Sequence, residues 1–182
     1  MNPSPLDRVV LPAALADRPV DEQFGLPVPF VNTYDDGSHD YAAINRRRSI
    51  QCALSRLCGM CGTSLAYDIA FLGGPKAAES RSYTDPPMHV DCAEAALQLC
   101  PHLLAHTSPP ADGERRRLRA GVTTADMFTS DRPAEWVLYV THNFEIERAT
   151  AEGGGLVLVF HPGPAERERR FRFDDGAMRE LT

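Results

Sequence analysis

The clearest signal in this 182-residue chain is LCGMCG, residues 57–62. Cys58 and Cys61 are separated by two residues, so both sulfurs can face one ion, and Gly62 lets the chain turn tightly behind them. A cysteine pair of this spacing also occurs in redox sites, so it does not identify a metal site by itself. A metal site requires a second pair of ligands elsewhere in the chain.

The second pair lies in PPMHVDCA, residues 86–93. His89 and Cys92 are three residues apart at the start of a predicted helix, where they share one face, and the helix N-terminus favours a thiolate. Residues 57–62, called the knuckle below, supply the first pair. A knuckle pair followed by a pair in the first turn of a helix is the arrangement of a treble-clef zinc finger. We therefore predict one zinc ion bound by Cys58, Cys61, His89 and Cys92. Three thiolates and one imidazole close the tetrahedral shell, so we expect the zinc to be structural rather than catalytic.

Cys52 and Cys100 remain outside this set, and each lies on the apolar side of its predicted helix. We expect both to be buried thiols that pack as small hydrophobic groups. The alternative is that one of them replaces His89 as a ligand. Cys100 lies two helical turns beyond Cys92, which is too far for the same ion.

The part of the chain before the knuckle contains several prolines. Residues 1–24 indicate a mobile arm or a strap along the surface. Residues 27–34 have strand composition, and their prolines favour an edge position. A turn at 35–38 and a returning strand at 41–44 complete a predicted hairpin.

Two helices and a short strand surround the predicted ligands. Asn45 is a predicted N-cap for a helix over about 46–57, with an apolar stripe formed by Ile50, Ala53, Leu54 and Leu57. Residues 67–72 form a predicted strand that ends at Gly73-Gly74-Pro75. The second helix is expected from near Pro87 to Pro101.

The last third of the sequence has β character. Strands are predicted at 136–143, 156–161 and 167–173, separated by GGG and PGP, which favours an antiparallel meander. Residues 106–134 are predicted to be a long surface connection.

These patterns predict an α+β fold with a treble-clef zinc finger at its centre and a small antiparallel sheet. A single zinc-stabilised domain over 25–182 follows the arm. Within it, the treble clef covers about 56–104 and the meander about 134–174.

The charge of the chain bears on its partners. Lys and Arg number 19 and Asp and Glu 25, for a formal net charge of −6, which argues against a generic nucleic-acid binder and against attachment to an anionic membrane. No run reaches the roughly 18 apolar residues of a membrane span, and the first residues do not resemble a signal peptide. We expect a cytoplasmic protein.

Three residues are candidates for holding a ligand away from the zinc: Arg46, Arg47 and Tyr41. Arginines at a helix N-terminus face its partial positive charge, so an anionic ligand is one interpretation. The alternative is a solvated face balanced by the acidic residues Asp35, Asp36 and Asp40. An HNH-type nuclease is not expected, because residues 67–75 contain no histidine to act as general base.

Five segments in this order resemble a group of short, largely uncharacterised proteins common in high-GC actinobacteria: GLPVPF at 25–30, LCGMCG at 57–62, FLGGP at 71–75, PPMHVDCA at 86–93 and CPHL at 100–103. The resemblance implies a zinc site and a bacterial cytosolic setting. It implies no activity.

Two function classes follow. The first is a zinc-binding accessory or binding protein that has a structural zinc and acts on an unknown protein or small molecule. The second is a small bacterial enzyme of specialised metabolism, with a small-molecule pocket between the N-terminal hairpin and the C-terminal strands.

Overall fold

Antiparallel strands and short helices make up the protein, so the α+β class is confirmed. The computed structural model describes residues 9–41, 43–99, 134–150, 154–174 and 177–182. Within these ranges, strands pair in the order β2-β1-β3-β6-β7, where the strands are β1 (Ile69–Gly73), β2 (Met88–His89), β3 (Glu135–Thr141), β6 (Arg167–Asp174) and β7 (Ala177–Leu181). A separate pair is formed by β4 (Phe144–Thr150) and β5 (Leu156–Pro162).

Both faces of strand β1 are buried. Ala70 and Leu72 face a core cluster that contains α4 (Val90–Leu99), whereas Ile69 and Phe71 face a second cluster. Successive side chains of a strand point to opposite faces, so a strand covered on both sides is apolar along its whole length. The burial of both faces explains the continuous apolar run in this segment.

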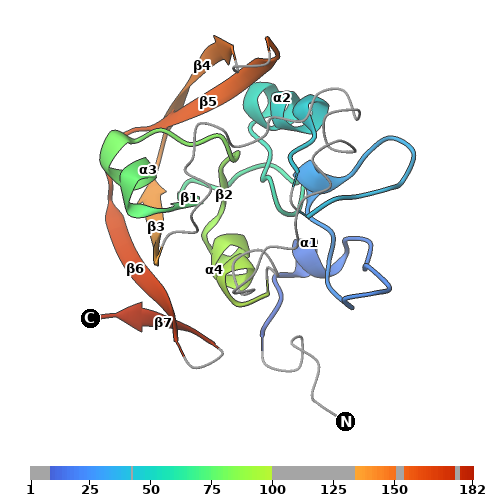
Figure 1. Ribbon diagram of the computed structural model, residues 1–182, viewed down its shortest axis with the longest axis horizontal. Helices are drawn as coiled ribbons and strands as arrows, with labels where there is room; N and C mark the ends of the chain where they lie inside the picture. Colours follow the sequence, from blue (N-terminus) through green and yellow to red (C-terminus); the bar gives the residue numbers. More distant parts are fainter. Residues whose placement is uncertain (1–8, 42, 100–133, 151–153, 175–176) are drawn as a thin grey trace.

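Helices cover the two faces of the sheet (Figure 1). Helix α4 packs on the first face, and α1 (Ala13–Ala16) contributes the fully buried Leu15 to the same cluster. The second face is covered by α3 (Pro75–Ser80), a helix that the sequence analysis did not predict. Pro75 occupies the first turn of α3, where its missing N–H is not needed, so the glycine-proline signal starts a helix here.

Helix α2 (Arg46–Ser55) confirms the predicted cap but not the predicted stripe. The Asn45 side chain accepts hydrogen bonds from the backbone N–H groups of Arg47 and Arg48. Ser49, Cys52 and Ala53 are buried, while Leu54 is 78% exposed. The helix contacts β5 and the 3-10 turn η2 (Phe30–Asn32) through this face, where small side chains allow close packing.

The N-terminal segment follows the second of its two predicted alternatives, a strap. Leu15 is fully buried, and Val20 forms a β-bridge with Pro27, so residues 9–24 pack on the core as a strap rather than a mobile arm. The expected strand at 27–34 is instead interrupted by η2. Prolines 27 and 29 have no N–H to donate, which removes alternate hydrogen bonds that a strand would need.

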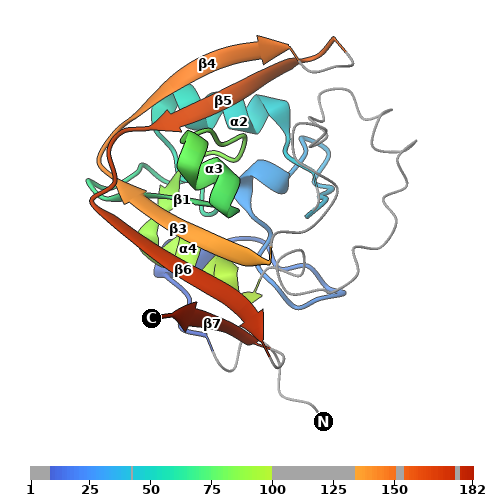
Figure 2. The same cartoon turned by 60° about the vertical axis from the view of Figure 1, so that its left-hand side comes forward.

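The C-terminal strands do not form the predicted meander. Strand β3 pairs with β6 and β4 with β5, so the strands form one long bent hairpin (Figure 2). Val140 pairs with Arg167, and Phe144 pairs with Pro162. Between these two pairs the chain from β3 to β4 runs four residues (140 to 144), whereas the chain from β5 to β6 runs five (162 to 167). The extra residue lies at the bend, between the two strand pairs. The PGP sequence marks that bend, not a hairpin turn. Cys100, Pro101, the end of the predicted treble clef and nearly all of the 106–134 connection lie outside the described residues.

Candidate metal centre

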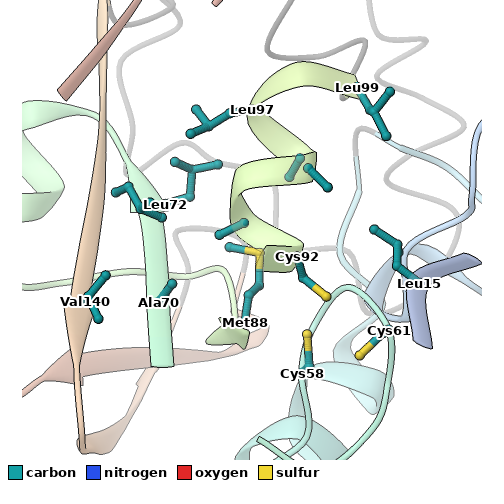
Figure 3. Close-up of a cluster of buried hydrophobic side chains, with 14 of the residues drawn as sticks. Leu15, Cys58, Cys61, Ala70, Leu72, Met88, Cys92, Leu97, Leu99 and Val140 are labelled. Carbon is teal, nitrogen blue, oxygen red and sulfur yellow. The ribbon is translucent and has the colours of Figure 1, made fainter. Parts of the chain in front are cut away.

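Four side chains from three parts of the chain converge on one point. Cys58 and Cys61 lie in the knuckle, His89 ends β2 and Cys92 lies in the first turn of α4; their ligand atoms are all within 4.8 Å of one another. Figure 3 shows the three sulfurs pointing toward one another at the N-terminal end of α4. This group can hold a metal ion.

Two nitrogen–sulfur distances in the group fit a tetrahedral zinc ion. Bond lengths of about 2.0–2.3 Å place neighbouring ligand atoms about 3.6–3.8 Å apart. The His89 Nδ1 atom lies 3.4 Å from the Cys61 sulfur and 3.9 Å from the Cys92 sulfur. The donor set and its spacing are therefore consistent with zinc.

The knuckle is shaped by its own backbone. The Cys58 N–H donates to the Thr63 carbonyl and the Gly62 N–H donates to the Cys58 carbonyl, both at 2.8 Å. Gly62 has φ +79°, and a Cβ atom there would lie 2.7 Å from a ring carbon of Phe30. Only glycine satisfies both conditions.

Strand pairing places the histidine. His89 pairs with Ile69 of β1 and precedes α4, so it lies at a strand end. The sequence analysis had instead expected it at the start of the helix. Its Nε2 atom is 2.9 Å from the Ser64 carbonyl oxygen. A carbonyl only accepts, so Nε2–H is the donor and Nδ1 keeps its lone pair toward the sulfurs.

The three thiols compete for one negative charge. Hydrogen bonds from the Cys58 and Cys92 thiols hold the pKa of Cys61 well below its usual range. Hydrogen bonding to Cys58 and Cys61 raises the pKa of Cys92. All three sulfurs are buried, so they can ionise together only beside a cation.

Cys52 behaves as predicted. It is fully buried and is not part of the four-residue group. Burial raises the pKa of its thiol to about 12, so it packs as a small apolar group.

The predicted ligand-holding residues Arg46, Arg47 and Tyr41 lie in three different settings. Arg46 lines a hollow of about 20 Å³ together with Leu156–Leu158 of β5, and neither Arg47 nor Tyr41 lines it. Arg47 is 71% exposed and pairs with Asp35 at 2.5 Å, as the solvated-face alternative expects. The Tyr41 hydroxyl donates to the Leu26 carbonyl, and its ring packs edge-on against Phe24.

Two residues beside the knuckle were missed by the sequence analysis, namely Arg18 and Phe30. The Arg18 guanidinium lies 5.7 Å from the centre of the Phe30 ring, and Arg48 lies 4.9 Å from it. No local motif joins these residues, because their contact depends on how the N-terminal strap folds back.

A second hollow, of about 390 Å³, lies at the bend of the C-terminal hairpin; its lining includes Arg81, Asn143, Glu145 and His161. Ser82 lies 3.3 Å from His161 Nδ1, and His161 Nε2 lies 2.8 Å from Glu147. This resembles a nucleophile–base–acid arrangement, but Nδ1 also lies 3.1 Å from the Arg81 carbonyl oxygen. Nδ1 therefore lies beside two oxygens, the Ser82 hydroxyl and the Arg81 carbonyl, so this geometry does not single out Ser82 as its partner.

No family model, curated protein or solved structure matches the chain. Among the described residues, no helix combines the length and apolar character needed to cross a membrane.

Proposed function

We propose that the protein is a zinc-binding accessory or binding protein whose zinc ion is structural. The observation that carries this proposal is the convergence of Cys58, Cys61, His89 and Cys92. Four protein ligands fill a tetrahedral shell and leave no position for water or substrate. The zinc would tie the knuckle, β2 and α4 to one point.

We further propose that the knuckle, the β1–β2 pair and α4 form a treble clef. The order of these parts along the chain and the antiparallel pairing of Ile69 with His89 support it. The sequence motifs support membership of the actinobacterial group and a cytoplasmic location, where thiols remain reduced and free to bind metal.

Elemental analysis tests the zinc proposal. We expect about one zinc per chain in the purified protein, and loss of this zinc in a Cys58→Ser, Cys61→Ser double variant. Cys52→Ser is the matched control, because it removes a buried thiol that is not part of the group. Zinc that is missing from the wild type, or undiminished in the double variant, would refute the proposal.

A small-molecule enzyme is the second candidate, supported by the hollow at the hairpin bend. Its volume of about 390 Å³ is in the range of small-molecule sites, and it lies away from the sulfur cluster. Thermal-shift titrations with small carboxylates and phosphates test it, with Arg81→Gln as the comparison. A shift in the wild type that is lost in this variant supports the candidate, and the absence of any shift counts against it.

A further inference from the structure

We propose that the N-terminal strap, residues 9–24, is a gate over the metal centre. Leu15 closes the centre, side-chain bonds from Arg18 and Asp21 hold the strap shut, and zinc leaves the centre while the strap is open. This inference rests on the proposed zinc-binding function and concerns how the metal of that site is exchanged.

The sulfurs of the metal centre are shielded from solvent. Cys58, Cys61 and Cys92 are 0%, 5% and 1% exposed, so a chelator can reach a bound ion only after a covering element moves. Leu15 belongs to the cover, because it is fully buried and packs in the same core cluster as the three cysteines. Figure 3 shows its side chain near those of Cys61 and Cys92.

The strap is held by fewer backbone bonds than the knuckle. The Gly59 N–H donates to the Pro87 carbonyl at 2.9 Å, which joins the knuckle to the segment before β2. In the strap, α1 has only four residues and no side-chain hydrogen bond at its start, and a β-bridge joins Val20 to Pro27. Local opening begins where buried contacts and backbone bonds are few, so the strap should open before the knuckle does.

Two groups of side-chain bonds oppose this opening. Three residues after Leu15, the Arg18 Nε atom donates to the Val28 carbonyl and its Nη2 atom donates to the Thr33 hydroxyl, both at 2.9 Å. Further along, the Asp21 carboxylate pairs with His39 Nε2, and the two side chains are 10% and 26% exposed. Thr33 and His39 lie outside the strap, so both contacts are lost when the strap lifts away.

The same Asp21 carboxylate also orders the end of the strap. Its Oδ1 atom accepts hydrogen bonds from the backbone N–H groups of Gln23 and Phe24, both at 2.7 Å. The His39 ring packs edge-on against the Tyr41 ring, with the ring centres 5.4 Å apart. These contacts keep the two members of the pair in place, so the pair acts as a latch between the strap and the loop that carries His39.

The rate of zinc loss should follow the fraction of molecules whose strap is open. A substitution that removes a bond made only by the closed strap raises this fraction, and so accelerates zinc loss. A substitution that removes a bond present in both the closed and the open strap leaves the fraction unchanged. Arg169 supplies such a bond, because it pairs with Glu94 of α4 and Glu180 of β7.

Transfer of zinc from the loaded protein to an excess of a chromophoric chelator, at fixed pH, tests the proposal. We expect His39→Ala and Thr33→Val each to accelerate the transfer about five-fold, the effect of losing one ordinary hydrogen bond from the closed state. Arg169→Ala is the matched control: it removes a partly exposed ion pair far from the strap, and should leave the transfer rate within about two-fold of the wild type.

The outcomes separate a gate from general unfolding. Equal acceleration in all three variants would show that zinc leaves through global unfolding, and no acceleration in His39→Ala and Thr33→Val would show that the strap does not control the rate; either result overturns the proposal.

The wild type provides a test without substitutions. Transfer through strap opening should depend only weakly on urea, because little surface is exposed, whereas a dependence as steep as that of equilibrium unfolding overturns the gate. A wild type that binds no zinc would refute the zinc-binding function and this inference with it. A wild type that binds zinc but fails these tests leaves the zinc-binding function intact.

Discussion

Replacing Gly62 by alanine should destabilise the knuckle in two ways, through its positive φ and through the contact of the new Cβ with Phe30. Gly62 has φ +79°, a conformation that costs a residue with a Cβ about 1–2 kcal/mol. The new Cβ would also lie 2.7 Å from Phe30 Cδ2 and 2.9 Å from its Cγ, which forces the ring to move. The ring cannot move freely, because the Phe30 backbone is bonded to Met60 and two guanidinium groups contact the ring. Overpacking of this kind adds about 1–3 kcal/mol, so we expect a total loss of about 2–5 kcal/mol in the free energy of unfolding.

Gly37→Ala is the matched control. Gly37 has φ +82°, but a Cβ there would meet nothing within 4 Å, so only the backbone cost of about 1–2 kcal/mol remains. Urea unfolding of both variants, each saturated with zinc, measures the difference. If the two substitutions cost the same, Phe30 does not restrain the knuckle and the packing argument is wrong.

Three further predictions follow from the site and its surroundings. Removing the metal with a strong chelator should cause cooperative loss of structure, because the four ligands join separate elements; a far-ultraviolet circular dichroism spectrum that stays unchanged would contradict this. In the zinc-loaded protein, nitrogen NMR of His89 should show Nδ1 bound to metal and Nε2 protonated, as its bond to Ser64 requires, and the opposite assignment would show that this bond is absent in solution. Burial of Asp21 alone would raise the pKa of its carboxyl, but hydrogen bonds from the backbone of Phe24, from His39 and from the backbone of Gln23 lower it overall. The stability that the ionised carboxyl contributes to the fold is therefore present above the ordinary pKa of 3.8 and is lost as pH falls through the lower folded value. Asp21→Asn should therefore reduce stability at pH 7, with the gap to the wild type closing below about pH 4 in thermal unfolding; a gap that widens in acid would show that the sign is wrong.

Much of the candidate metal centre could be predicted because its signals are local. Two residues between Cys58 and Cys61 suffice for both sulfurs to reach one ion, whatever the rest of the chain does. The Asn45 cap was predictable for the same reason, since its side chain bonds N–H groups only two and three residues away. The buried face of α2 was not predictable, because the partners of Ser49, Cys52 and Ala53 come from distant segments.

The pairing of the C-terminal strands shows where local signals end. GGG and PGP both favour a change of direction, but a bend and a hairpin turn have the same composition. The distinction depends on which strands are covered by other elements. Strand β3 is buried between the two core clusters, whereas β4 is largely exposed. Only the packing of β1 and α4 against β3 decides this.

Local patterns were enough to predict the four candidate ligands, the α+β class and the capped helix before the knuckle, because spacing and capping act within a few residues. The tertiary structure alone decided which nitrogen of His89 faces the sulfurs, how the hairpin bends, and that Arg18 lies beside the knuckle. These features depend on contacts between residues far apart in the chain, such as Ser64 with His89 and Val140 with Arg167. Such contacts form only when apolar faces are buried together, and burial is a property of the whole fold.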